Sequence, residues 1–531
     1  MVINCDLYKK DKGEAAKVIS KDKNRRTQNK YINMIRSIIT SGGALILNCM
    51  INLILTPYIS KTAGTDAYGF VSLAKTFSIY ASILTVALNS YASRHVSVAY
   101  HQNEREKANI FHSSVFYGNV ILSTAIMAVS IPFIIFMEHI LNIPERMVLD
   151  VKILFFLTMF TLCASTILST YSTAAIIADR LDISGIFKIL SYVSEIAVLV
   201  ICYKFLPTMI FYVGIGILVS AMVTGFAGVY INKRYVPKLI IRKKYYRRYA
   251  VKRLVGDGIW QALNLLGVSL NNGLDLLTCN LLLTSIDMGN LAIAKTFHSV
   301  ISGAFVLIGQ AFHPMFLKAY SENDKETLLK DLKLSMKISG MFANIAFAGF
   351  FALGIPFYKL WIPTQDINVI YILTVLDILV VIPGGPMQPL YYIYTLTVKN
   401  KFPTIVTILG GCANVAGMYV LIKFFGMGVN AVVITTAVVM GFTNFVSNPI
   451  YMAKVLNIPK ITFYPDIFQN LVSCTIMVFV FRIIDNALAP ASWLSLGVNA
   501  ILCAIAGIPI HAIITCNREQ IAGIKKVFVR N

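Results

Sequence analysis

The chain is too apolar for a water-soluble fold, because 57% of its 531 residues are hydrophobic and only 14% are charged, whereas soluble domains carry about 25% charged residues. Its formal net charge of +22 could indicate nucleic-acid binding, but the 47 Lys and Arg residues lie between apolar runs, which argues against it. The nine cysteines show no CxxC pair and no metal-ligand spacing, so we interpret them as small apolar packing residues.

Apolar runs long enough to cross a bilayer follow one another along the chain. A hydrocarbon core of roughly 30 Å requires about 20 helical residues. Six such runs precede a strongly basic segment, at 37–59, 67–92, 110–137, 153–178, 186–205 and 208–231. Eight follow it, at 257–283, 289–312, 338–358, 367–395, 403–422, 427–452, 466–484 and 491–515. The sequence therefore predicts an all-α, multi-pass protein of the cell membrane with about fourteen transmembrane helices.

The distribution of basic residues assigns a side to each loop. With the N-terminus in the cytoplasm, 38 of the 47 Lys and Arg residues fall in cytoplasmic segments and 7 in outer loops, as the positive-inside rule requires. These counts include basic residues within three residues of a span end, and the other two, Lys75 and Lys295, lie well inside predicted spans. Both termini are therefore expected in the cytoplasm. Residues 1–36 lack the apolar core of a signal peptide and are predicted to form a basic cytoplasmic tail.

An internal repeat relates the two sides of the basic segment. Residues 68–77, YGFVSLAKTF, match residues 288–297, MGNLAIAKTF, and both begin the second span of a six-span block. Blocks with the same orientation are related by a pseudo-two-fold axis along the membrane normal and can enclose a cavity for alternating access. The predicted domains are a six-helix half at 37–231, a basic cytoplasmic linker at 232–256, a second six-helix half at 257–452, and helices thirteen and fourteen with a cytoplasmic tail at 453–531.

The turn between the first two spans carries a family resemblance. Residues 56–69, TPYISKTAGTDAYG, contain a Pro-Tyr pair and a Gly-x-x-x-Tyr-Gly turn. They resemble the polysaccharide-transport branch of the multidrug, oligosaccharidyl-lipid and polysaccharide exporter superfamily. Residues 280–289, NLLLTSIDMG, are similar to the corresponding turn of the second half, although they lack its earlier glycine.

The resemblance implies a flippase. Such a protein moves an undecaprenyl-diphosphate-linked oligosaccharide from the cytoplasmic to the outer leaflet for capsule, O-antigen or exopolysaccharide assembly. Its expected partners are that lipid-linked cargo, a polysaccharide polymerase and glycosyltransferases. Anionic membrane lipids are further expected partners, because the basic run at 242–248 lies beside the membrane.

Charged side chains inside the spans are the first candidates for a binding site, since each costs about 2.5–3.5 kcal/mol at the bilayer centre. Lys75 and Lys295 occupy repeat-related positions. Either they face the cavity and bind the diphosphate, or they snorkel to the outer interface. Asp275 could neutralise Lys295, whereas the equivalent position in the first half is Leu55, so Lys75 is favoured as the free cation.

Two carboxylates are predicted to lie deeper in the membrane. Glu195 and Asp377 are about ten residues into their spans, where an unpaired carboxylate must be protonated or bind a cation. The pattern therefore suggests ion coupling, and the alternative is a hydrogen-bonded contact between packed helices. Asn271 and Asn272 add a polar patch to the span at 257–283.

The span at 367–395 is predicted to contain a break. Pro383 and Pro386 flank Gly384 and Gly385, and together they remove helix hydrogen bonds within the bilayer. Such a break lines a cavity in many transporters, and the alternative is a static kink.

Arg94 follows the second span on the predicted cytoplasmic side. It is similar to an arginine that the family often places there, which implies contact with the diphosphate on the cytoplasmic side. The alternative is an anchor that fixes the topology.

Three classes of function fit these features: a glycolipid flippase, a cation-coupled multidrug exporter of the same superfamily, and a membrane-embedded glycan polymerase or acyltransferase. Two repeat-related lysines among the intramembrane charges favour an anionic cargo. The outer loops are short, and neither His298 nor His313 belongs to a catalytic motif. No catalytic residue, cofactor or metal is therefore predicted.

Overall fold

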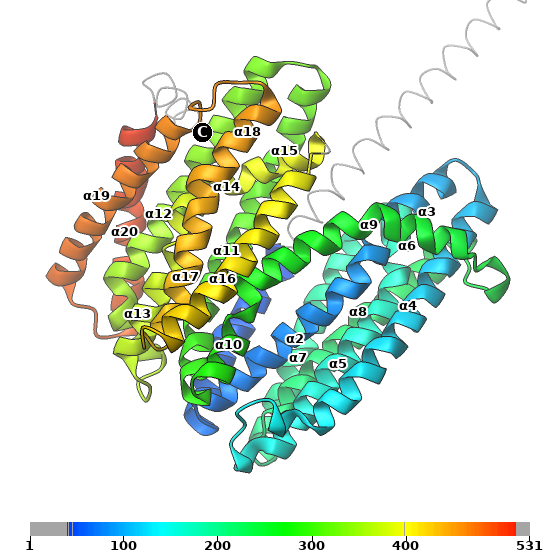
Figure 1. Ribbon diagram of the computed structural model, residues 1–531, viewed down its shortest axis with the longest axis horizontal. Coiled ribbons are helices and arrows are strands. Elements are labelled where there is room, and N and C mark those ends of the chain that lie inside the picture. The colour runs from blue at the N-terminus through cyan, green and yellow to red at the C-terminus, as the bar shows by residue number, and fades with distance from the viewer. Residues whose placement is uncertain (1–39, 41, 45, 398, 517–531) are drawn as a thin grey trace, which may run out of the picture.

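The computed structural model describes residue 40 and residues 42–44, 46–397 and 399–516, and this part of the chain is helical without a β-strand (Figure 1). Thirteen of its helices are long and apolar enough to cross a membrane. The prediction of an all-α, multi-pass membrane protein is thereby confirmed. The tail at 1–36 and the last residues of the chain lie outside the described residues, so the side on which each terminus lies stays a prediction.

The helices before the basic segment gather in one bundle (Figure 1). The first span is Gly42–Thr62. It is followed by α2 (Thr65–Asn89), α3 (Ala92–His101), α4 (Arg105–Ile135), α5 (Val148–Ser169), α6 (Thr173–Ile177), α7 (Leu181–Phe205) and α8 (Phe211–Tyr235).

A second bundle holds most of the remaining helices, and α9 (Arg248–Val268) runs between the two, in contact with α2 and α16 (Figure 1). After α9 the chain forms α10 (Leu274–Leu282), α11 (Ser285–Ser321), α12 (Lys325–Trp361), α13 (Ile367–Ile378), α14 (Val381–Met387), α15 (Tyr391–Leu396), α16 (Lys401–Lys423), α17 (Asn430–Phe442), α18 (Asn448–Leu456), α19 (Tyr464–Leu488) and α20 (Trp493–Thr515).

The predicted span at 257–283 is not among the thirteen apolar helices. In its place the chain is helical from the start of α9 to the end of α10, with a π-helical turn at Ser269–Gly273. Polar residues such as Gln261, Asn264 and Asp275 lower the hydropathy of this segment. A fourteenth span therefore stays a prediction.

The two longest described helices, α11 and α12, begin at capped ends. Thr284 and Asp287 form a capping box at the start of α11, and Asp324 accepts a hydrogen bond from the Thr327 amide at the start of α12. The five Lys and four acidic residues at 318–337 predict a separate solvated amphipathic helix between two spans, and that prediction is wrong. Residues in this range complete α11 and begin α12, because the short turn at 322–324 allows both spans to extend directly to it.

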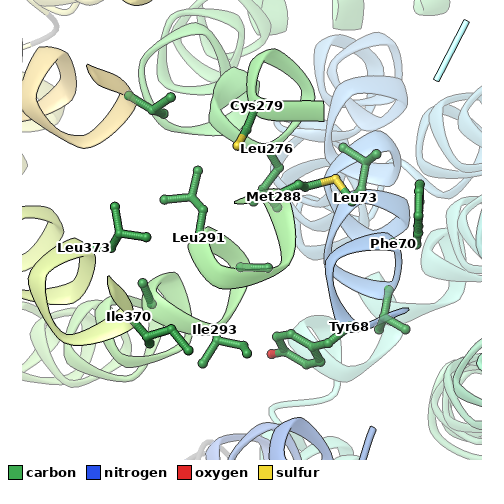
Figure 2. Packing of buried hydrophobic residues seen from close by; sticks show 14 of the residues in the cluster. Tyr68, Phe70, Leu73, Leu276, Cys279, Met288, Leu291, Ile293, Ile370 and Leu373 are labelled. Atoms are coloured by element: carbon green, nitrogen blue, oxygen red, sulfur yellow. The ribbon is translucent and has the colours of Figure 1, made fainter. Parts of the chain in front are cut away.

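The two bundles meet at the repeated segment. Tyr68, Phe70 and Leu73 of α2 belong to one buried cluster with Leu276 and Met288 of the second bundle (Figure 2). The repeat-related glycines touch, since a Cβ atom built on Gly69 would lie 3.0 Å from the Gly289 Cα atom. Contact between equivalent positions places the pseudo-two-fold axis close to this pair.

This close approach generates a prediction about stability. A Cβ atom at Gly289 would lie 2.2 Å from the Thr65 carbonyl oxygen, so Gly289→Ala must displace backbone and should cost about 1–3 kcal/mol. The matched control is Gly349→Ala in α12, where a Cβ atom meets nothing within 4 Å. There the higher helix propensity of alanine should stabilise the folded protein by about 0.5–1 kcal/mol. Thermal unfolding in detergent measures both, and equal melting temperatures would contradict the proposed contact.

Candidate functional site

A cavity of about 680 Å³ lies where the two bundles meet, and we call it the cationic cavity. Its wall includes Lys75 of α2, Lys188 and Glu195 of α7, and Lys295 of α11. Serine, threonine and asparagine side chains supply much of the remaining wall. The repeat-related lysines thus line one cavity, together with a third lysine from the first bundle.

Lys75 and Lys188 form no ion pair with any described residue. The Lys75 ammonium group donates a hydrogen bond to Asn52 Oδ1 at 3.2 Å. Glu195 is buried and lies against α8, where a Cβ atom on Gly216 would be 3.3 Å from its Cγ atom. The wall therefore presents two ammonium groups whose charge no carboxylate contacts directly.

Lys295 has a different environment, within a cluster of four charged or titratable side chains that we call the charge cluster. Its Nζ atom lies 2.5 Å from Asp275 Oδ2 and 3.4 Å from Asp377 Oδ1. His298 Nδ1 lies 2.9 Å from Asp377 Oδ2. The side chains of Asp275 and Asp377 are 0% and 1% exposed, so these pairs are buried inside the protein.

The charge cluster changes the interpretation of Lys295. The sequence suggested that Asp275 could neutralise it, and the structure has that pair together with a second carboxylate. Lys295 lines the cavity, but its charge is balanced by its own neighbours and is not free in the way that the Lys75 charge is.

A second cavity, of about 490 Å³, lies within the second bundle, and we call it the neutral cavity. Seven amide side chains line it, which are those of Gln261, Asn264, Asn271, Gln388, Asn400, Asn444 and Asn448. The predicted helix break does not lie at Pro383–Pro386, which are α-helical within α14; irregular turns flank them at 379–380 and at Gln388–Leu390. Gly384 and Gly385 line the cavity, whereas Pro383 and Pro386 are buried nearby and are not among the lining residues. The side chain of Asn272 lies outside the described part of the structure.

Arg94 lies apart from both cavities, in a pocket of about 510 Å³ on the predicted cytoplasmic side. Lys107 and Arg253 line the same pocket. His95 Nε2 lies 2.7 Å from Asp257 Oδ2, which joins α3 to α9 across the two bundles. Arg94 was expected to line a cavity with Lys75 and Lys295. It lines this peripheral pocket instead and does not line the cationic cavity.

Two residues of the site were missed from sequence alone. Lys188 is counted above with the cytoplasmic basic residues because it lies at the very start of the predicted span at 186–205, whereas α7 begins seven residues before it, at Leu181. His298 is considered above only for a catalytic motif, which it lacks, but it contacts Asp377. Its spacing of three residues from Lys295 places both on one helix face, which was the available signal.

The charge cluster predicts an asymmetry between the two repeat-related lysines. Lys295→Ala leaves two buried carboxylates without their cation and should cost about 3–5 kcal/mol of stability. Lys75→Ala removes a partly exposed hydrogen bond and should cost about 1 kcal/mol.

Thermal unfolding in detergent compares these variants. The double variant Lys295→Met with Asp275→Leu should recover part of the loss, because it removes both members of the shortest pair. Equal melting temperatures for Lys295→Ala and Lys75→Ala would show that the charge cluster does not hold the helices together.

Comparison with known proteins gives the chain a family. A family model described as polysaccharide biosynthesis protein matches residues 34–320, which is more than half of the chain. The uncharacterized membrane protein EpsK of Bacillus subtilis (strain 168) is 26% identical over 478 residues, covering 90% of this chain and 94% of EpsK.

Solved structures share the fold. The lipid II flippase MurJ in an inward closed conformation is similar with a TM-score of 0.67 and 15% identity, over 90% of this chain and 99% of the MurJ chain. An inward-facing multidrug resistance transporter of the MATE family gives a TM-score of 0.57 and 14% identity, over 81% of this chain and 96% of that chain. At these identities the likeness shows the fold alone.

Proposed function

This chain belongs to the polysaccharide biosynthesis protein family, and from that premise we propose that it is a flippase for a lipid-linked oligosaccharide. The cargo is an undecaprenyl-diphosphate-linked glycan, which moves from the cytoplasmic to the outer leaflet by alternating access. The polymer served is a capsule, an O-antigen or an exopolysaccharide. Support comes from the family and from the fold that the chain shares with a protein named as a lipid II flippase.

The cationic cavity is the observation that carries this proposal. A diphosphate leaving water needs cationic hydrogen-bond donors, and the wall offers the Lys75 and Lys188 ammonium groups, neither of which forms a direct ion pair with a described carboxylate, although Glu195 is near enough to Lys75 for their charges to interact. A multidrug exporter that carries cations is the alternative. It is disfavoured because three lysines line this wall and Glu195 is its one carboxylate among the described residues.

Contacts between the bundles at both ends of the cavity support alternating access. On the predicted outer side, Trp361 Nε1 donates a hydrogen bond to the Leu53 carbonyl at 2.7 Å, and Gln365 Nε2 donates to the Ser60 carbonyl at 3.1 Å. On the predicted cytoplasmic side the corresponding contact is the His95–Asp257 pair. Asn142 and Asn280 also exchange hydrogen bonds on the outer side, so the outer set is larger than the cytoplasmic pair, and we expect the two sets to break in turn as the bundles move.

The Arg94 pocket has a role in the same proposal. Its cations would meet the diphosphate on the cytoplasmic side before the headgroup enters the cationic cavity.

The charge cluster is the proposed site of ion coupling. Asp275 and Asp377 bring two negative charges and Lys295 one positive charge, so a further proton or cation balances the set, and His298 is placed to hold a proton. Glu195 is the equivalent candidate in the first bundle, since it lines the cationic cavity. We assign the coupling role to Asp377 first, because it contacts both Lys295 and His298.

Transport by purified protein in liposomes tests the cargo site. Lys75→Ala should slow the movement of a labelled undecaprenyl-diphosphate oligosaccharide about tenfold or more, because it removes a charge-assisted contact to the diphosphate. The matched control is Lys61→Ala, whose side chain is exposed near the end of the first span. Equal rates for the two variants would remove Lys75 from the substrate site.

The same assay with imposed proton or sodium gradients tests the coupling site. Asp377→Asn should abolish the response to the gradient, while Lys295 keeps its pair with Asp275. Asp366→Asn, at the start of α13, preserves a capping side chain and should leave that response unchanged. A normal gradient response in Asp377→Asn would place coupling elsewhere.

A further inference from the structure

We propose that the neutral cavity binds the saccharide part of the cargo, while the cationic cavity binds the diphosphate. This inference rests on the proposed function and adds a second subsite to it. The ligand class is a neutral, hydroxyl-rich oligosaccharide. At about 490 Å³ the neutral cavity falls within the range of about 300–1,000 Å³ that is usual for small-molecule sites.

The chemistry of the wall suits sugar hydroxyl groups. The described lining residues include no Asp, Glu, Lys or Arg, and His298 is the one titratable imidazole among them. Amide side chains both donate and accept hydrogen bonds, as hydroxyl groups do, so seven amides on one wall can satisfy many sugar hydroxyls. The stacked rings of Tyr391 and Tyr394 add an apolar face for the carbon face of a sugar ring.

Departures from regular helix surround this cavity. The π-helical turn at Ser269–Gly273 supplies Asn271, and a second π-helical turn at Thr443–Ser447 supplies Asn444. The helix break between α14 and α15 supplies Gln388. Such irregular turns cost helix hydrogen bonds and are frequent at functional sites. Their convergence on one cavity is difficult to explain by packing alone.

Part of the polar wall is fixed and part is free. Tyr391 donates a hydrogen bond to Asn444 Oδ1 at 2.5 Å, and Asn448 donates to the same oxygen at 3.2 Å. Asn271 is 3% exposed, and its Oδ1 atom has no partner among the described residues. A buried, unsatisfied acceptor on a cavity wall needs a donor from a ligand or from water.

Three further amides are available to a ligand. The side chains of Gln261, Asn264 and Gln388 line the cavity and make no hydrogen bond with another described residue. They differ in this respect from Asn444 and Asn448, which hold the wall together.

The two cavities are adjacent along α11. Lys295 lines the cationic cavity, and His298 and Ser302 line the neutral cavity. Seven residues of α-helix separate Lys295 from Ser302, which is about 10 Å at 1.5 Å per residue. Because Lys75 and Lys295 line one cavity, a diphosphate bound there lies beside this part of α11, and its glycan would extend along α11 into the neutral cavity. That cavity continues to Thr395 and Asn400, beside the predicted cytoplasmic end of the second bundle.

Substrates of different glycan length separate the two subsites. The probes are undecaprenyl-diphosphate carrying one hexose and the same lipid carrying five neutral hexoses, each in liposomes with the full chain. The double variant Asn264→Leu with Gln388→Met removes two free amides without touching the Tyr391 network. Its transport of the long substrate should fall about tenfold, with transport of the short substrate unchanged. Asn486→Leu, on the exposed end of α19, is the matched polar-to-apolar control.

Calorimetry with the lipid-free pentasaccharide gives an independent measurement of the site. Wild-type protein in detergent should bind the sugar, and the double variant should not. Two results would overturn the glycan subsite: equal transport of the long substrate by the variant and the wild type, or an equal loss of transport for both substrates. Either would leave a cavity that holds water only. If the wild type moves neither lipid, the proposed function fails, and calorimetry still decides whether the neutral cavity binds saccharide.

Discussion

A buried charge in lipid must find its counter-charge within the protein, and the second bundle is organised around this constraint. Lys295 of α11 pairs with Asp275 of the preceding helix α10 and with Asp377 of α13, so one cation ties three helices together. In the described part of the first bundle Lys75 has no ion pair of this kind, because Leu55 occupies the position that corresponds to Asp275. The same lysine is therefore structural in one repeat and available to a ligand in the other.

This asymmetry extends to the cavities. The repeat-related glycines, Gly69 and Gly289, keep the two bundles in close contact on either side of a common axis. Around that axis the first bundle supplies Lys75 and Lys188 to a cationic wall, and the second bundle supplies uncharged amides to a neutral one. Duplicated halves can thus divide an amphipathic headgroup between them, with charge recognised in one half and hydroxyl groups in the other.

Hydropathy predicted the spans well, because lipid imposes length and apolarity on each helix separately. Hydropathy failed where contacts between helices determine the structure. The segment containing Asn271 and Asp275 is more polar than a typical span, and the expected helix at 318–337 is formed by the ends of two spans. Lys75, Asp275 and Asp377 could be identified as rare charges within spans. The neutral cavity could not, because its amides come from separate helices and each is unremarkable alone.

The polar segment from α9 to α10 has a consequence for biogenesis. As it leaves the ribosome, it carries Asp275 without a counter-charge, and insertion of that carboxylate into lipid costs about 2.5–3.5 kcal/mol. The neutralising residue, Lys295, is on the next helix and is synthesised only afterwards. If this segment is the predicted fourteenth span, we expect the translocon to retain it until α11 follows, so that the two enter the bilayer as a helical hairpin with the ion pair already formed.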